Sequence, residues 1–204
     1  MTNIGVLVSG RGSNLQAIID NVESGYIPGK ITVIISNKED AFGLERARKH
    51  NIPAEYVPMK KGEPREEYDA RVIEVLDKYN VDLVCLAGYM LIVSKPFVNK
   101  YKNAMINIHP ALLPAFAGGI HAQQEALDWG VKVSGCTVHF VTNDIDSGPI
   151  IVQKAVPVLE DDTVQTLSAR IIEQEHKAFP EAIKLFCEGR LKVQGREVMV
   201  LPEK

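Results

Sequence analysis

The sequence has few cysteines and no long apolar run, and both absences narrow the class of protein. Its three cysteines, Cys85, Cys136 and Cys187, lie far apart, so they fit neither a disulfide framework nor a CxxC metal site. No apolar run approaches the roughly 20 residues of a membrane-spanning helix. The N-terminus lacks the charged start and cleavage site of a signal peptide. We therefore expect a cytoplasmic protein without a membrane partner.

A surplus of basic residues is also absent. Lysine and arginine together number 23 against 26 aspartates and glutamates, which leaves a formal net charge of −3. Without a basic field the chain cannot neutralise a phosphate backbone, so we expect no nucleic-acid partner. The HExxH and CxxC metal motifs and the GxSxG serine elbow are missing too. We expect neither a bound metal nor a covalent serine mechanism.

What is present is a regular alternation of β-branched apolar runs with amphipathic segments. With 204 residues, of which 46% are hydrophobic, the chain is long enough to bury its own core. The alternation predicts an α/β fold in one domain, residues 1–204, with a doubly wound, mostly parallel sheet. Two later extended runs predict an antiparallel C-terminal extension, which a long C-terminal helix follows.

The positions of these elements follow from the period at which apolar residues recur in each segment. Strands are expected at residues 4–8, 31–35, 55–57, 83–87, 104–109, 134–141 and 150–158. Helices are expected near residues 15–22, 41–49, 64–79, 96–101, 123–129 and 163–187. The last helix contains Pro180, which predicts a kink or break there.

Asn107 and His109 are the most informative polar residues. They stand two positions apart in an apolar run, so in a strand their side chains project from the same face. Pro110 cannot continue a ladder, which predicts that the strand ends near His109. Because open α/β sheets bind ligands at the carboxyl ends of their strands, the pair is a candidate site. A strand-end histidine bonded to backbone is the alternative.

A glycine-rich turn at residues 10–14, with the sequence Gly-Arg-Gly-Ser-Asn, joins the first expected strand to the first helix. Glycines admit a ligand close to the backbone, and a helix N-terminus presents unpaired N–H groups to a phosphate. The turn is neither a P-loop nor a full dinucleotide fingerprint, since Leu15 stands where the third glycine belongs. A tight turn in which Ser13 caps the helix is the alternative interpretation.

An acidic turn at residues 144–149 separates the last two expected strands. A carboxylate near His109 would raise the pKa of the imidazole and fix its tautomer. The spacing does not choose between Asp144 and Asp146, and the Asp, Ser, Gly and Pro residues of the segment also suit an ordinary turn. Of the other histidines, His139 lies inside an expected strand, where a structural role is expected.

Together these motifs resemble the phosphoribosylglycinamide formyltransferases, folate-dependent enzymes of purine synthesis. The resemblance covers nearly the full length, through residues 6–18, 36–38, 41–44, 86–90, 107–110, 138–142, 146–149 and 174–176. It implies transfer of a formyl group from 10-formyltetrahydrofolate, the co-substrate, to the amine of N1-(5-phosphoribosyl)glycinamide. This reaction belongs to de novo purine (IMP) biosynthesis and uses no metal.

The resemblance also implies roles for particular residues. Asp146, which precedes the Gly-Pro pair of the family motif, would join Asn107 and His109 as the catalytic trio. The residues that would bind glycinamide ribonucleotide are Gly12, Ser13, Asn14 and Glu175. Those that would bind 10-formyltetrahydrofolate are Arg65, Met90, Leu91, Ile92, Val93 and Asn107. Many relatives have arginine in place of Leu91 and serine in place of Ala111, which would change cofactor affinity but not the reaction.

Three other functions compete with this one. A 10-formyltetrahydrofolate deformylase carries an added N-terminal regulatory domain, whereas this chain begins almost at once with a strand. A methionyl-tRNA formyltransferase has a further C-terminal domain and needs a basic surface, whereas this chain has a formal net charge of −3. A non-catalytic dinucleotide-binding module needs the third glycine that the turn lacks. We expect an enzyme of small molecules that is a monomer or a weak homodimer.

Overall fold

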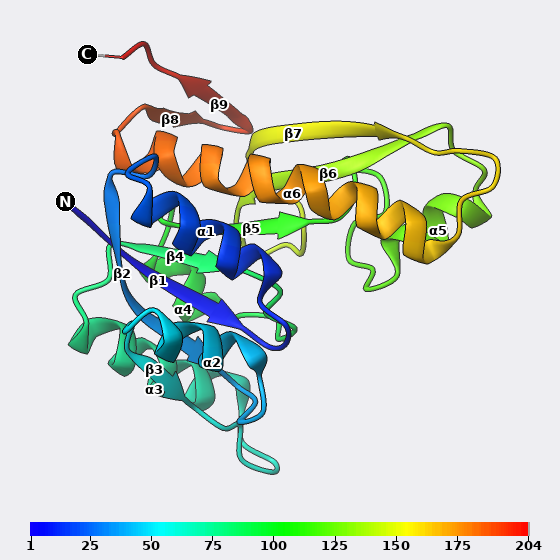
Figure 1. Cartoon of the computed structure of the whole chain (residues 1–204). Coiled ribbons are helices and arrows are strands. Elements are labelled where there is room, and N and C mark those ends of the chain that lie inside the picture. Colours follow the sequence, from blue (N-terminus) through cyan, green and yellow to red (C-terminus); the bar gives the residue numbers. More distant parts are fainter. Residues whose placement is uncertain (204) are drawn as a thin grey trace. The chain divides into compact units, whose positions relative to one another are not determined.

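The computed structural model describes residues 1–203, and the chain divides into two compact units, Met1–Asn107 and Ile108–Lys204 (Figure 1). The division falls inside strand β5 (Met105–His109), so Asn107 closes the first unit and His109 belongs to the second. The predicted α/β class is confirmed in both units. That residues 1–204 act as one domain stays a prediction. No helix within the described residues is long and apolar enough to cross a membrane.

The first unit holds a parallel sheet with the strand order β3-β2-β1-β4-β5. The strands that precede β5 are β1 (Thr2–Val8), β2 (Gly29–Ser36), β3 (Ala54–Tyr56) and β4 (Leu83–Leu86). All four residues of β4 are buried, which explains why its sequence is continuously apolar. The chain moves outward from β1 to β3 and then returns to place β4 on the other side of β1. Ligands of open α/β sheets bind at such a reversal.

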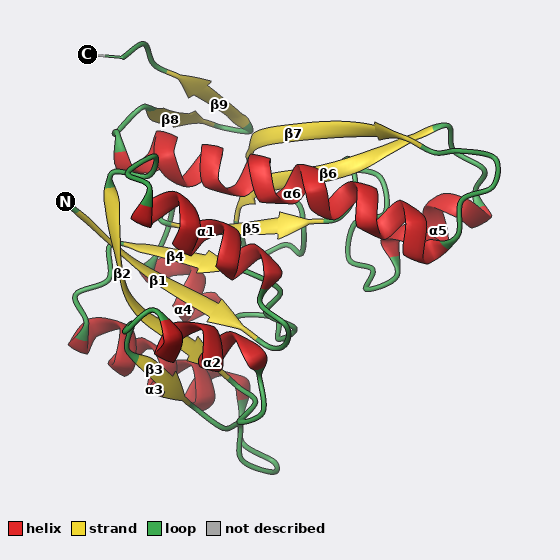
Figure 2. Cartoon of the chain, in the orientation of Figure 1, coloured by secondary structure: helices red, strands yellow, loops and turns green. Residues whose placement is uncertain are grey.

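Helices cover the two faces of this sheet (Figure 2). They are α1 (Ser13–Glu23), α2 (Phe42–Lys49), α3 (Arg65–Lys78) and α4 (Lys95–Lys100). Helices α1 and α2 lie side by side, where Arg46 Nη1 donates to Gln16 Oε1 at 2.9 Å. Helices α3 and α4 lie together on the opposite face, where Lys100 pairs with Asp77 at 2.7 Å. The doubly wound arrangement that the sequence predicts is thus confirmed in this unit.

The turn between β1 and α1 depends on two glycines. Gly12 has a φ of 69°, in the left-handed region that glycine adopts without steric cost. A Cβ on Gly12 would lie 3.1 Å from Gly43 Cα on α2, and a Cβ on Gly43 would lie 2.8 Å from Val8 Cγ2. The Gly43 N–H donates to the Gly10 carbonyl at 3.1 Å. The turn therefore packs backbone against backbone on the start of α2.

Helix α1 is capped by Gly12, and the predicted Ser13 cap is wrong. Ser13 is the first residue of the helix, and no side chain makes a capping hydrogen bond there. The left-handed glycine itself turns the chain into the helix, so a serine cap is not needed. The first N–H groups of α1 are consequently not engaged by a capping side chain.

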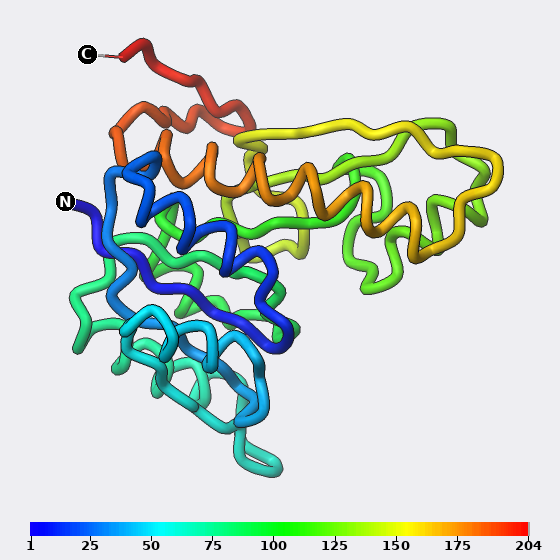
Figure 3. Tube along the Cα trace, viewed as in Figure 1, coloured from blue at the N-terminus to red at the C-terminus, as the bar shows by residue number. Residues whose placement is uncertain are grey.

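The second unit is built around an antiparallel strand pair. After the end of β5, its elements are α5 (Ala122–Asp128), β6 (Val133–Phe140), β7 (Ile150–Pro157), α6 (Val164–Cys187), β8 (Leu191–Gln194) and β9 (Glu197–Val200). Figure 3 shows the chain turning back along β7 beside β6, and α6 packs on both strands. Strands β8 and β9 form a separate hairpin. The antiparallel extension and the long C-terminal helix are confirmed.

Helix α6 runs without interruption through Pro180, so of the predicted kink or break the break is wrong, and the kink stays a prediction. A proline inside a helix costs about 3 kcal/mol, because it removes one hydrogen bond and crowds the preceding turn. Each fully buried Leu, Ile or Phe contributes about 1.5–3 kcal/mol. The residues that α6 buries completely on both sides of the proline are Leu167, Ile171, Ala178, Phe179, Ala182 and Ile183. Their burial outweighs the cost of one proline.

We expect Gly12→Ala to destabilise the protein and Gly10→Ala to leave its stability nearly unchanged. Alanine at a left-handed φ costs roughly 1–2 kcal/mol, and at position 12 it also meets the Gly43 backbone. A Cβ on Gly10 meets nothing within 4 Å. Urea unfolding followed by circular dichroism measures both variants. Equal unfolding midpoints for the two would contradict the described turn.

Candidate active site

The glycine-rich turn lies at the reversal point of the sheet, directly after β1. Ser13 and Asn14 open α1, whose first N–H groups have no partner within the helix. The 11-residue helix adds a partial positive charge at this end. Such an end binds phosphate oxygens without a lysine.

Residues 87–94, which follow β4, lie beside that turn. The Ser9 N–H donates to the Gly88 carbonyl at 3.1 Å, and Ser9 Oγ accepts from the Met90 N–H at 2.9 Å. On this held backbone the side chains of Met90 and Ile92 are 59% and 64% exposed. Exposed apolar side chains on a fixed backbone offer a surface to a flat apolar ligand.

Arg65, the first residue of α3, has one unsatisfied edge. Its Nε lies 3.2 Å from Asp69 Oδ1, and its guanidinium lies over the Tyr68 ring, 5.2 Å from the centroid. Its Nε and Nη2 are both buried, and neither makes a hydrogen bond to any described residue. A buried donor without an acceptor costs about 1–3 kcal/mol, and a ligand carboxylate at this edge would remove that cost.

Strand β5 carries Asn107 and His109 two positions apart, so their side chains project from the same face. The strand ends at His109, directly before Pro110, as the sequence predicts. Asn107 is half-buried, and His109 is buried with 5% of its surface exposed. The ring of His109 is therefore held by its protein neighbours.

Both ring nitrogens of His109 face acceptor oxygens. Nε2 lies 2.9 Å from the Phe116 carbonyl oxygen, and Nδ1 lies 3.4 Å from Asp146 Oδ2. A carbonyl oxygen only accepts, so Nε2 carries a proton and donates it. With a second proton on Nδ1 the ring is an imidazolium that faces a carboxylate.

Asp146 lies in the turn between β6 and β7 with a φ of 48°, a left-handed value that Asp and Asn tolerate. Its Oδ2 accepts the Gly118 N–H at 2.9 Å. Burial by itself raises the pKa of this carboxyl. Hydrogen bonds from His139 and Gly118, with the nearby charge of His109, outweigh burial, so the pKa lies below its ordinary value. Asp146 is therefore a carboxylate at neutral pH.

The geometry distinguishes the two aspartates between which the spacing could not choose. Asp144 is exposed, and its backbone carbonyl closes the turn by accepting from the Ser147 hydroxyl at 3.4 Å. Asp146 is only 13% exposed at its side chain and makes the ion-pair contact with His109.

His139 completes this cluster, although the sequence pattern predicts no more than a structural role for it. It lies on β6 with 2% of its surface exposed. Its Nδ1 donates to the Phe140 carbonyl at 3.0 Å, and its Nε2 lies 3.6 Å from Asp146 Oδ1. The Asp146 carboxylate thus lies between two imidazoles, one facing each oxygen. One feature of the sequence could have indicated this role: a histidine inside a buried strand needs polar partners for its ring nitrogens.

Glu175 lies on α6 and is buried, with 6% of its surface exposed. Burial first, and then the charge of Glu175, raises the pKa of the Cys136 thiol on β6 to about 12. Cys136 is thus a protonated, inert thiol. The structure places His109, Asp146 and Glu175 in the second unit, and Gly12, Ser13, Asn14, Arg65, Met90, Leu91, Ile92, Val93 and Asn107 in the first.

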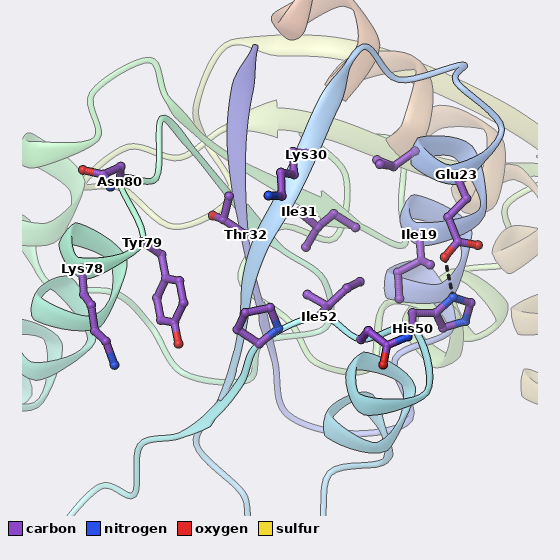
Figure 4. Close-up of a pocket in the computed structure, with 13 residues that line it drawn as sticks. Ile19, Glu23, Lys30, Ile31, Thr32, His50, Ile52, Lys78, Tyr79 and Asn80 are labelled. Carbon is purple, nitrogen blue, oxygen red and sulfur yellow. Dashed lines mark hydrogen bonds and ion pairs between the residues drawn. The ribbon is translucent and has the colours of Figure 1, made fainter.

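A hollow of about 530 Å³ in the first unit is lined by other residues (Figure 4). Its lining includes the first residues of β2 and those just before β3, so it lies at the amino edge of the sheet. Ile19, Ile31 and Ile52 give it an apolar lining, and a His50–Glu23 ion pair of 2.7 Å borders it. None of the predicted site residues lines it. Residues 1–203 contain no group of three or more His, Cys, Asp or Glu placed to hold a metal ion.

The sequence signature of the formyl transferases matches residues 2–183. The chain belongs to this family. The phosphoribosylglycinamide formyltransferase of Escherichia coli is 46% identical to it, over 94% of this chain and 90% of the relative. The trifunctional purine biosynthetic protein adenosine-3 of Bos taurus is 48% identical over 95% of this chain. The chain spans only 19% of that longer protein.

Solved structures agree with this family assignment. Glycinamide ribonucleotide transformylase 1 from Symbiobacterium toebii matches with a TM-score of 0.97 and 54% identity, over 99% of this chain and 95% of its own. A formyltetrahydrofolate deformylase from Pseudomonas syringae pv. tomato has a TM-score of 0.92 at 27% identity, and this chain covers 66% of it. The two matches share the fold, and the sequence is more similar to the transformylase.

We expect His139→Ala to raise the pKa of Asp146. In the native protein this pKa lies below the ordinary value of 3.8, because the donors outweigh burial. The variant loses the donor that lowers the pKa most, so the pKa moves upward. A ¹³C NMR titration of the Asp146 carboxyl measures its midpoint over the pH range in which the protein is folded. His50→Ala, which removes a histidine paired with Glu23, is the control and leaves the midpoint in place. Equal midpoints in native protein and His139→Ala would contradict the contact.

Proposed function

We propose that this protein transfers the formyl group of 10-formyltetrahydrofolate to the amine of N1-(5-phosphoribosyl)glycinamide in purine biosynthesis. The observation that carries the proposal is the pair of the buried His109 and the half-buried Asp146, with His109 Nε2 donating to a carbonyl oxygen at 2.9 Å. The identity of 46% to a bacterial phosphoribosylglycinamide formyltransferase over most of both chains supports the choice of substrate. The lower identity of 27% to the deformylase disfavours simple hydrolysis.

In the proposed reaction the substrate amine attacks the formyl carbon, and negative charge develops on the formyl oxygen. The side-chain amide of Asn107 and Nε2–H of His109 donate hydrogen bonds to that oxygen. The Phe116 carbonyl is the chemical stand-in for the formyl oxygen, because it accepts from the same nitrogen. For the formyl oxygen to bind there, the Phe116 carbonyl must withdraw.

Asp146 keeps the proton on the imidazole. Its lowered pKa supports this role, because a carboxylate facing Nδ1 stabilises the imidazolium form of His109. As the tetrahedral intermediate collapses, the bond between the formyl carbon and N10 breaks. The new C–N bond stays on the glycinamide amine, and the proton lost by that amine reaches N10 of the departing tetrahydrofolate. Neither a metal nor a covalent enzyme intermediate is required.

Binding of the two substrates is assigned to separate groups. The start of α1, at Gly12, Ser13 and Asn14, holds the phosphate of glycinamide ribonucleotide, and Glu175 accepts from its ribose or amine. The folate lies on residues 90–93 (Met90, Leu91, Ile92 and Val93) and contacts Asn107, and Arg65 faces its carboxylates. The exposed Met90 and Ile92 and the unsatisfied Arg65 Nη2 support that fit. We further propose a cytoplasmic enzyme that is a monomer or a weak homodimer.

We expect Asn107→Ala to lower turnover about 10²- to 10³-fold, the loss found when one oxyanion donor is removed. His109→Ala loses turnover as well, and in both variants binding of glycinamide ribonucleotide persists. Steady-state kinetics measure kcat, and calorimetry measures substrate affinity. If these variants lost binding but kept kcat, the proposed oxyanion role would be wrong.

Asp146→Asn tests the carboxylate without disturbing the backbone, because asparagine also tolerates a left-handed φ. We expect turnover to fall, since an amide no longer stabilises the imidazolium. Asp144→Asn is the matched control in the same turn and should retain turnover. Native turnover of Asp146→Asn across the whole pH range would exclude the proposed role of Asp146.

We expect release of tetrahydrofolate only when glycinamide ribonucleotide is present. The loss of 10-formyltetrahydrofolate is followed by absorbance with and without the amine substrate. Equal rates in the two assays would identify a hydrolase instead of a transferase.

A further inference from the structure

Asp69 is a buried carboxyl group that the proposed reaction leaves unused. It lies on α3 with none of its surface exposed, one helical turn after Arg65. A carboxylate is buried in a protein only where donors or cations face it. The two oxygens of Asp69 have different partners, and each partner belongs to one of the two segments assigned above to the folate.

The first partner is the backbone of the segment after β4. Asp69 Oδ2 accepts the Ser94 N–H at 2.6 Å, and Ser94 is the N-cap residue of α4. Residues 87–94 belong to neither β4 nor α4, so their position depends on such contacts. Ser9 holds the near end through the Met90 N–H. Asp69 holds the far end, and the apolar span 90–93 is fixed between them.

The second partner is the guanidinium of Arg65. Asp69 Oδ1 lies 3.2 Å from Arg65 Nε, in an i,i+4 pair within α3. Because Nε faces Asp69 and the plane of the group lies over the Tyr68 ring, the orientation of the guanidinium is set on two sides. Both Nε and Nη2 are buried and make no hydrogen bond to a described residue, whereas the Arg65 side chain as a whole keeps 23% of its surface exposed for a ligand.

A tyrosine relay ties the same segment to α3. The Tyr68 hydroxyl donates to the Val57 carbonyl at 3.1 Å, which only accepts. The single hydroxyl proton of Tyr68 is thereby used, so Tyr89 is the donor in the 3.0 Å contact between the two hydroxyls. Two consecutive residues of α3, Tyr68 and Asp69, thus hold the segment that carries Met90 to Val93.

We propose that Asp69 is a positioning residue for the folate. Its one carboxylate sets the backbone of residues 90–93 and the guanidinium of Arg65 relative to each other. A single ligand with a flat ring system and an anionic tail then meets both at once. The inference rests on the proposed function, which assigns these two segments to 10-formyltetrahydrofolate.

Asp69→Asn tests the inference by keeping an acceptor for the Ser94 N–H while removing the charge that faces Arg65. We expect the KM and the Kd for 10-formyltetrahydrofolate to rise about tenfold, as for other coupled charged neighbours. The KM for glycinamide ribonucleotide and kcat should not change. A merely structural role would lower thermal stability without separating the two substrates. In an Arg65→Met background, Asp69→Asn should add little, because its effect acts through the arginine.

Ser94→Pro provides a second test if Asp69→Asn folds poorly. The φ of −75° at Ser94 lies within the range of proline, so this variant removes the N–H that Asp69 accepts and leaves the carboxyl in place. It too should weaken folate binding selectively. The control is Glu63→Gln. Glu63 lies just before α3 and pairs at 2.7 Å with Arg71 within that helix, and the substitution breaks this ion pair. It should lower stability and leave folate affinity unchanged.

The outcomes separate this inference from the proposed reaction. If the native protein transfers formyl groups and both Asp69→Asn and Ser94→Pro bind 10-formyltetrahydrofolate normally, the inference is overturned and the reaction stands. If the native protein binds the folate without formylating glycinamide ribonucleotide, and the variants bind it more weakly, the reaction fails and the inference stands. Absence of folate binding in the native protein overturns both.

Discussion

Parallel hydrogen bonding of β1 to β2 on one side and to β4 on the other is the constraint on which the first unit depends. Because β1 has partners on both sides, the chain must reverse its direction of travel across the sheet. The reversal brings the turn at Gly12 and the segment after β4 to one edge, where Ser9 bonds to both Gly88 and Met90. A helix N-terminus and an exposed apolar segment therefore become neighbours through sheet topology, without any contact in sequence.

Both units use a carboxylate with little exposed surface in the same way, Asp69 fully buried and Asp146 half-buried. Asp146 accepts a backbone N–H from Gly118 and faces His109 and His139. Asp69 accepts a backbone N–H from Ser94 and faces Arg65. In each case one oxygen accepts from a loop N–H, and the carboxylate also faces a basic side chain. Removing one partner would leave a charge buried without compensation, so such clusters hold a single arrangement.

The fold was largely predictable because hydrophobic period reports which face of a segment is buried. The pattern failed where tertiary packing overrides a local preference. Pro180 stays helical because the helix is buried on both sides of it, and Gly12 replaces Ser13 as the cap because its backbone packs against Gly43. The contacts of His139 with Asp146 and of Asp69 with the Ser94 N–H were not predictable, because they join groups from different elements. The contact of Asp69 with Arg65, by contrast, has the i,i+4 spacing of a helical pair.

The hydrogen bond from His109 to the Phe116 carbonyl has a consequence for how the proposed reaction divides its energy. A formyl oxygen that replaces this carbonyl exchanges one neutral acceptor for another, so the ground-state complex gains almost nothing from the exchange. An oxyanion is a stronger acceptor than a neutral carbonyl oxygen, so the hydrogen bond from His109 strengthens as negative charge develops. The benefit of His109 then appears only as charge develops. In the proposed reaction, the loop carbonyl would thereby make this contact a determinant of kcat and not of KM.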